Sequence, residues 1–169
     1  MAAANSSELP EWERRLHALL PIFGHRNWIV VADSAYPAQS KPGIETLYAG
    51  GDQIDAVRIV SHVIAEQKHI RANIYLDEEL AFVSDAESRG ADEYRRQIAS
   101  LLGPSATRLP HEQIIARLDE SAQVFRILIV KTDLTIPYTS VFFELDCGYW
   151  SAEAEQRLRK SIAAKKSNP

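Results

Sequence analysis

The sequence predicts a single α/β domain with a mixed β-sheet that carries helices on its faces. Short apolar runs alternate along the chain with segments whose apolar residues recur every three or four positions, the pattern of strands alternating with amphipathic helices. The chain has 169 residues, 46% hydrophobic and 25% charged, so one core can be buried. We expect the domain to span residues 1–150 and a helical extension to follow over 151–169.

The first third of the chain predicts a helix, a strand and a long loop. Ser7 is a favoured helix-capping residue, helical spacing of apolar residues begins at Trp12, and Pro21 ends that pattern. The β-branched run 28–32 is bounded by Gly and Pro and predicts a buried strand. The segment 33–51 is rich in Pro and Gly, so we expect a loop there.

The middle of the chain predicts a helix, a strand and a second helix. Asp52 is expected to cap an amphipathic helix whose buried residues recur over 54–64. The apolar run 72–76 predicts a short strand. The acidic segment 77–92 has no clear pattern, and helical spacing then resumes over 94–102 until a Gly-Pro pair stops it.

The last third predicts one more helix, two strands and the extension. Pro110 suits the first turn of a helix. The segments 124–130 and 139–145 predict strands. Because the connection 131–137 is too short for a crossover helix, we expect these two strands to pair in an antiparallel manner. From residue 151 a thin apolar stripe among charges is typical of a helix that packs loosely or docks on a partner.

The charge balance argues against a nucleic acid or an anionic membrane as partner. The formal net charge is -4 and the pI is about 5.7, whereas both partners favour a basic face. The basic residues over 157–166 are balanced locally by Glu153 and Glu155, so we interpret them as a solvated helix face. No apolar run has membrane-spanning length, and the first residues lack a signal-peptide pattern, so a cytoplasmic protein is expected.

Metal and nucleotide sites have little support in the sequence. Zinc sites need three or four converging ligands, but neither His-x-x-x-His nor Cys-x-x-Cys occurs. The glycine-rich motifs that bind nucleotide phosphates are absent. Gly50 and Gly51 precede a predicted helix and could hold an anion at its N-terminus, which is a weak signal on its own. We therefore expect neither a metal nor a cofactor.

Four polar residues are candidates for chemistry. His25 lies between a glycine and the strand 28–32, and histidine is the side chain most often used for proton transfer near neutral pH. Asp33 follows that strand but could instead hold the turn before Pro37. His111 could simply begin a helix, and Tyr138 could cover the edge of the sheet.

The spacing of His25 and Asp33 limits how they can act together. Eight residues of extended chain separate them, roughly 26 Å at about 3.3 Å per residue. A dyad along one straight strand is therefore excluded. Either the flanking loops fold back, or the working site combines residues from two subunits.

Several motifs resemble the ribose pyranase and fucose mutarotase family. They are Gly24-His25, Ala32-Asp33 with Tyr36-Pro37-Ala38, and Pro137-Tyr138-Thr139-Ser140 ahead of Val141-Phe142-Phe143. The segment after Asp33 is more similar to the fucose mutarotase branch, and His111-Glu112-Gln113 to the ribose pyranase branch. The resemblance extends from about Leu9 to Gly148.

The resemblance implies an isomerase that interconverts anomers or ring forms of a free monosaccharide such as fucose or ribose, without metal or cofactor. It also implies a cyclic homo-oligomer with its sites between subunits. His25 would then be the proton donor, while sugar hydroxyls would be held by Asp33, His111, Tyr138, Thr139 and Ser140.

Two departures from the family pattern support an alternative. Arg26-Asn27 stands where the family usually has Gly-Asp after the histidine, and Ser140 stands where it has asparagine. A sugar-binding protein without catalysis on the same fold is therefore the second hypothesis.

Overall fold

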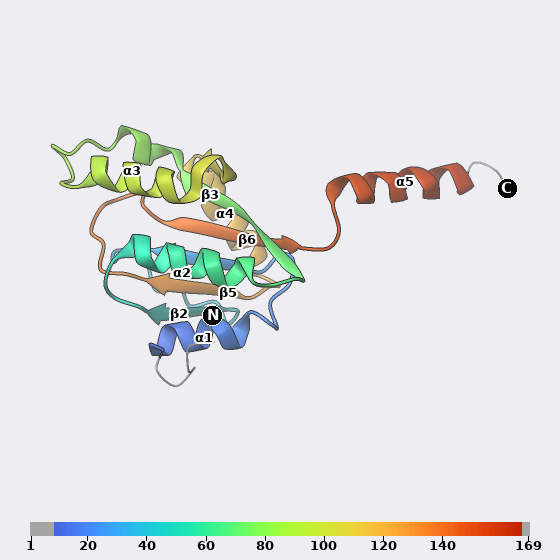
Figure 1. Ribbon diagram of the computed structural model, residues 1–169, viewed down its shortest axis with the longest axis horizontal. Helices are drawn as coiled ribbons and strands as arrows, with labels where there is room; N and C mark the ends of the chain where they lie inside the picture. Colours follow the sequence, from blue (N-terminus) through green and yellow to red (C-terminus); the bar gives the residue numbers. More distant parts are fainter. Residues whose placement is uncertain (1–8, 167–169) are drawn as a thin grey trace.

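Six strands form one mixed β-sheet in the computed structural model, which describes residues 9–166 of the chain (Figure 1). The order across the sheet is β2-β5-β1-β6-β3-β4. Strand β6 (Val141–Cys147) runs antiparallel to both of its neighbours, and the other pairings within these residues are parallel. The predicted α/β fold with a mixed sheet is confirmed.

Helices and strands alternate along the chain, as the apolar patterns predict. The remaining bounds are α1 Glu11–Leu19, β1 Trp28–Ala32, β2 Ile44–Tyr48, α2 Gln53–Ala65, β3 Ile70–Asp77, α3 Ala91–Leu102, β4 Ala106–Leu109, α4 His111–Ser121, β5 Ile127–Lys131 and α5 Ala152–Lys166, with 3-10 helices η1 at Glu78–Phe82 and η2 at Gly103–Ser105.

Different helices cover the two faces of the sheet. Successive side chains of a strand point to opposite faces. Ile29 and Val31 of β1 belong to the core shared with α1, α2 and α3, whereas Trp28 and Val30 belong to the core shared with α4. The apolar faces are thus occupied by helices, and polar side chains collect where the strands end.

The helix starts differ in how they are capped. Asp52 caps α2 as predicted, because its side chain accepts a hydrogen bond of 3.0 Å from the backbone N–H of Asp55. Ser7, the predicted cap of the first helix, lies outside the described residues. Pro10 and Pro110 directly precede α1 and α4, so each occupies the position before the first helical residue.

The predicted pairing of the last two strands is wrong. Strands β5 and β6 do run in opposite directions, but β1 lies between them and is hydrogen-bonded to both. All five residues of β1 are buried. Their backbone groups need a partner strand on each side, because buried N–H and C=O groups cannot bond to water. The connection after β5 therefore passes the end of β1, where Ser34 donates its N–H to the carbonyl of Leu134 at 2.9 Å.

Two strands lie where the sequence predicts none. Strand β2 falls inside the predicted loop 33–51, and β4 follows the Gly-Pro stop after α3. Both are at the edges of the sheet, and neither contains a fully buried residue. Their strand conformation depends on pairing with β5 and β3, so a local apolar pattern could not reveal it.

Helix α5 confirms the helical character expected of the extension. It projects away from the sheet beyond the end of β6 (Figure 1), and none of its residues is buried. Packing against residues 9–151 therefore does not explain its place in the fold.

We expect Gly148→Ala to lower the free energy of unfolding by about 1–3 kcal/mol. A Cβ atom there would lie 2.9 Å from backbone atoms of Lys68 and Ile70, which cannot move aside as a side chain tip can. Urea denaturation measures the change. Gly24→Ala is the matched control, because its Cβ would have nothing within 4 Å. Equal stability of the two variants would contradict the prediction.

Candidate functional site

The carboxyl ends of three parallel strands lie beside the start of β6, at one end of the sheet along the strand direction. Asp33 follows β1, Asp77 ends β3 and His111 follows β4, while the segment 137–140 leads into β6. Ligands of α/β proteins commonly bind at this end of a sheet. The residues enclose a pocket of about 320 Å³, toward the small end of the range of roughly 300–1,000 Å³ for small-molecule sites. Its polar lining is made by Asp33, Tyr36, Gln39, Asp77, His111, Tyr138 and Ser140.

A buried carboxylate faces the imidazole of His111 in this pocket. The Asp77 side chain is 1% exposed, and its Oδ1 lies 3.0 Å from His111 Nδ1. The other oxygen, Oδ2, is buried and has no hydrogen-bond partner within the described residues. Buried polar atoms nearly always have partners. Asp77 itself lines the pocket, and its unpartnered Oδ2 leaves it able to accept one more hydrogen bond.

Burial sets the protonation behaviour of the pocket. It raises the pKa of Asp77 to about 6, although the facing His111 acts in the opposite direction. Burial also raises the pKa of the Tyr36 phenol to about 12, with Asp119 and Asp77 contributing. At neutral pH the pocket therefore combines a mostly ionised carboxylate with a phenol that keeps its proton.

A residue of η1, Glu79, accepts hydrogen bonds from the backbone of His111. Its N–H donates to both carboxylate oxygens of Glu79 at 3.0 Å. His111 is the first residue of α4, as one interpretation of the sequence expected, and its ring is nevertheless 30% exposed and lines the pocket. Beginning a helix and lining a site are therefore compatible here.

The side chains of Asp33 and Ser140 meet at the carboxyl end of β1. Asp33 Oδ1 accepts the N–H of Ala35 at 2.9 Å, which is the turn-holding role considered for it. Its Oδ2 accepts a long hydrogen bond of 3.4 Å from Ser140 Oγ. Both side chains line the pocket, so one carboxylate holds the loop and still presents an oxygen to the site.

Tyr138 and Thr139 have different surroundings despite being neighbours. Tyr138 has a φ of 59°, rare for a bulky residue, and its ring meets His111 edge-on at 5.6 Å. Backbone strain of this kind clusters at functional sites. Thr139, in contrast, is fully buried and is not part of the pocket lining, and its hydroxyl donates to the carbonyl of Ile136 at 2.7 Å. Its side chain is therefore already occupied in holding the loop.

His25 lies at the other end of the strands, before the first residue of β1. Its turn is bonded to the end of β6, because Arg26 donates its N–H to Leu145 at 2.8 Å and Leu145 donates to Asn27 at 2.9 Å. Asn27 uses both ends of its side chain within this turn, accepting from Gly24 N–H and donating to the Arg126 carbonyl. His25 is exposed. Of the six predicted site residues, four line one pocket: Asp33, His111, Tyr138 and Ser140. Thr139 is buried beside Tyr138 without lining the pocket, and His25 does not line it either.

Asp77, Tyr36 and Gln39 are polar residues of the pocket for which the sequence predicts no role. Asp77 directly ends an apolar strand, as Asp33 nearly does, so the same strand-end rule could have found it. The obstacle is the acidic segment that follows, in which Asp77 is one carboxylate among several. Tyr36 is part of a quoted motif, but its burial becomes visible only in the fold.

The described part of the chain also bears on metal binding and membrane insertion. Within residues 9–166, no group of three or more His, Cys, Asp or Glu side chains is arranged to hold a metal ion. In the same range, every helix is too short or too polar to cross a membrane.

The sequence profile of the RbsD / FucU transport protein family matches residues 12–147. The chain belongs to this family. The match includes β1 to β6 and every residue that lines the pocket, and it ends before α5. The resemblance inferred from the sequence motifs is confirmed, and α5 is an addition to the matched region.

Solved structures share the fold of this RbsD / FucU family member. Bacillus subtilis RbsD complexed with D-ribose has a TM-score of 0.56 and 16% identity, over 86% of this chain and 98% of that one. The fucose mutarotase from Streptococcus pneumoniae in complex with L-fucose has a TM-score of 0.53 and 19% identity, over 82% and 96%. FucU from Bifidobacterium longum has a TM-score of 0.54 and 16% identity, over 82% and 96%. None of the curated proteins matches the chain significantly.

Proposed function

We propose that this family member interconverts the anomers or ring forms of a free monosaccharide, fucose-like or ribose-like, in the pocket at the carboxyl edge of the sheet. Family membership supports this substrate class, since structures of two relatives of the same fold contain D-ribose and L-fucose. The observation that carries the proposal is the Asp77–His111 pair, because both residues line the pocket and the buried Asp77 keeps one carboxylate oxygen without a hydrogen-bond partner.

The reaction requires one acid and one base. A proton added to the ring oxygen and a proton removed from the anomeric hydroxyl break the bond between the ring oxygen and the anomeric carbon, which leaves an open-chain aldehyde. Rotation and the reverse transfers close the ring as the other anomer or in the other ring size. No redox change occurs, and the protons balance over the cycle. General acid and base groups suffice for such chemistry.

We assign the base to Asp77 and the acid to His25. The Oδ2 atom of Asp77 accepts the proton of the anomeric hydroxyl, and His111 holds the other oxygen at 3.0 Å and steadies the ionised carboxylate. A base with a pKa of about 6 is mostly ionised at neutral pH and still has appreciable proton affinity. Asp33, Tyr138 and Ser140 hold the remaining hydroxyls, and Tyr36 forms part of the buried wall.

His25 reaches a pocket only if it belongs to another copy of the chain. Within one chain, the β1 strand separates His25 from Asp33. A head-to-tail contact that places the His25 end of one copy over the pocket of the next uses two different surfaces, and repeating it closes a ring when the rotation between copies is a whole fraction of a turn. A cyclic homo-oligomer with sites between subunits follows from this assignment.

A sugar-binding protein without catalysis is the second candidate. The observation that favours it is Asn27, which is engaged on both sides by the backbone of its own turn and of Arg126. It therefore does not orient the His25 imidazole as an acidic residue at this place could.

Saturation-transfer NMR on a panel of free aldoses separates the two candidates. We expect faster exchange between anomers or ring forms of L-fucose or D-ribose, and little effect on a sugar with other hydroxyl stereochemistry, such as D-glucose. Binding of a sugar without faster exchange would leave only the second candidate. Neither binding nor exchange with any sugar would refute both.

A further inference from the structure

Helix α5 buries none of its residues against the described part of the chain, residues 9–166. It spans Ala152–Lys166, none of its residues is buried, and it extends away from the sheet (Figure 1). Leu158 and Ile162 lie one turn apart on it and are 42% and 40% exposed. An isolated helix of this length is marginal in water without a tertiary partner. A partner surface is therefore needed to explain a stable helix at this place.

The charge of α5 is opposite to that of the rest of the chain. It contains five of the 19 Lys and Arg residues but only two of the 23 Asp and Glu residues, so it carries +3 while the rest carries -7. Arg159 is paired with Glu155. Arg157, Lys160, Lys165 and Lys166 have no ion-pair partner within residues 9–166.

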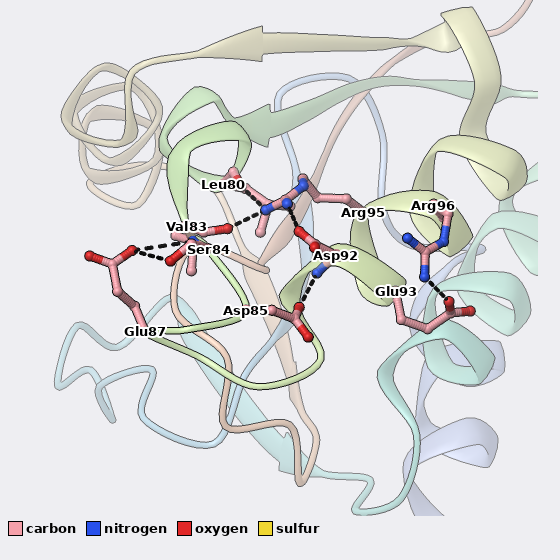
Figure 2. A network of polar contacts seen from close by, with 9 residues as sticks. All are labelled: Leu80, Val83, Ser84, Asp85, Glu87, Asp92, Glu93, Arg95 and Arg96. Carbon is pink, nitrogen blue, oxygen red and sulfur yellow. Dashed lines mark hydrogen bonds and ion pairs between the residues drawn. The ribbon is translucent and has the colours of Figure 1, made fainter.

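A matching set of carboxylates lies beside the pocket. In the acidic segment after β3, Asp92 and Glu93 are paired with Arg95 and Arg96, as Figure 2 shows. Glu87 bonds only to Ser84 in that network, on the side away from the arginines (Figure 2).

Three carboxylates of this segment form no ion pair within residues 9–166. Glu78, Glu79 and Glu87 have no cationic partner in the described part of the chain. Glu79 and Glu87 line a second hollow that shares Tyr138 with the pocket, and Phe82 beside them is 83% exposed. We call Glu78, Phe82 and Glu87 the acidic rim. Its two charges and its exposed ring complement the charge and the apolar stripe of α5.

The first residues of α5 follow the end of β6, which is the end of the sheet where His25 lies. The His25 turn is bonded to Leu145, and Asp146 next to it pairs with Arg71 at 2.6 Å. Strand β6 ends at Cys147 and α5 starts five residues later. A helix of 15 residues is about 22 Å long, at about 1.5 Å per residue. If His25 of one copy enters the pocket of the next, α5 of the same copy starts beside that pocket and can extend along its surface.

We infer that α5 docks on a second copy of this chain, with its basic residues against the acidic rim beside the pocket that receives His25. The inference rests on the proposed two-subunit site. Docking of α5 would add a second contact between the same two copies, outside the region that matches the family. The added helix would then serve assembly and not catalysis.

Charge reversal in the full chain tests the docking. We expect Arg157→Glu with Lys160→Glu to raise the dissociation constant between copies at least about tenfold at low salt, because like charges then face each other. Sedimentation of diluted samples measures this constant, and the difference should shrink in raised salt. A control of equal net charge change, Arg14→Glu with Arg58→Glu on α1 and α2, should leave association near the wild-type value.

A charge swap tests which surface is contacted. Adding Glu78→Lys and Glu87→Lys to the reversed helix should restore association, since the signs are then exchanged rather than opposed. Unchanged association of the reversed helix, or no recovery in the swapped chain, would overturn the inference. So would binding of the full chain to phosphatidylserine vesicles that is lost on reversal while assembly is unaffected, because α5 would then serve a membrane surface.

Measuring sugar ring exchange in the same samples shows which of the two proposals fails, the proposed function or the docking of α5. Absence of exchange in the wild-type chain refutes the proposed function, whatever the helix does. Normal exchange and assembly in the reversed chain refutes only the docking of α5. Removal of residues 151–169 gives a second readout, because α5 buries no residue and its loss should leave the circular dichroism of the sheet domain unchanged while association weakens.

Discussion

His25→Gln is expected to slow sugar ring exchange by about 10²–10⁴-fold, the usual contribution of a general acid or base. Glutamine keeps the size and polarity of the side chain but cannot transfer a proton near neutral pH. Because His25 is exposed and its turn is held by backbone and Asn27 bonds, the fold and the sugar affinity should persist. Exchange NMR and a sugar titration measure the two quantities. His62→Gln, at an exposed position on α2, is the matched control.

Coexpression of two inactive variants tests whether His25 acts across subunits. A chain with His25→Gln keeps an intact pocket, and a chain with Asp77→Asn keeps an intact His25. In randomly mixed rings about one quarter of the contacts join the intact histidine to the intact pocket, so about that share of the activity should return. No recovery in verified mixed assemblies would contradict a two-subunit site. Full activity of His25→Gln alone would remove His25 from the mechanism.

Asp77→Asn is expected to cause a loss of similar size, because the amide has nearly the shape of the carboxylate but is not a base. Its oxygen can still accept the bond from His111 Nδ1, so the ring should stay in place. In the wild type, exchange should rise as pH increases through about 6, where Asp77 ionises, and the variant should lack this rise. Asp55→Asn, on an exposed part of α2, controls for the loss of a charge.

The same substitution should raise stability at neutral pH. The folded state raises the pKa of Asp77 from 3.8 to about 6, so the carboxyl favours folding when it is protonated. That contribution is complete below about pH 4 and is lost as pH increases through about 6. The loss is at most about 3 kcal/mol, since one pKa unit is worth about 1.4 kcal/mol. Urea denaturation should show Asp77→Asn more stable than wild type at pH 7 and similar to it at pH 4. A less stable variant at pH 7 would show that the ionised carboxylate supports the fold.

Much of the fold could be predicted from local patterns. The helices that begin near Asp52 and Pro110 and the central strand 28–32 carry strong apolar periodicity or capping signals, and the structure has each of them. The boundaries of other strands shifted by two or three residues, as when β5 begins at Ile127 because Val124 is 79% exposed in the preceding turn. Such ends are set by where pairing partners begin and end, which a local pattern does not contain.

The candidate site was only partly visible in the sequence. His25 and Asp33 could be found as polar residues at the two ends of an apolar strand, and their separation could be estimated from strand geometry alone. The partnership of Asp77 with His111 could not, because the two residues are 34 positions apart in the chain. Thr139 looked like its neighbours Tyr138 and Ser140 in the sequence, and only the fold shows its hydroxyl occupied by Ile136.

The sequence by itself determined the class of fold, the family, the polar residues at the strand ends and the presence of a charged helix after the sheet. These depend on local periodicity, capping and short motifs, all of which act over a few residues. The tertiary structure alone decided that β1 separates β5 from β6, that Asp77 faces His111, and that His25 lies away from the pocket. Each of these depends on contacts between residues far apart in the chain, where burial of backbone groups and closure of the core select one arrangement among several that satisfy the same local patterns.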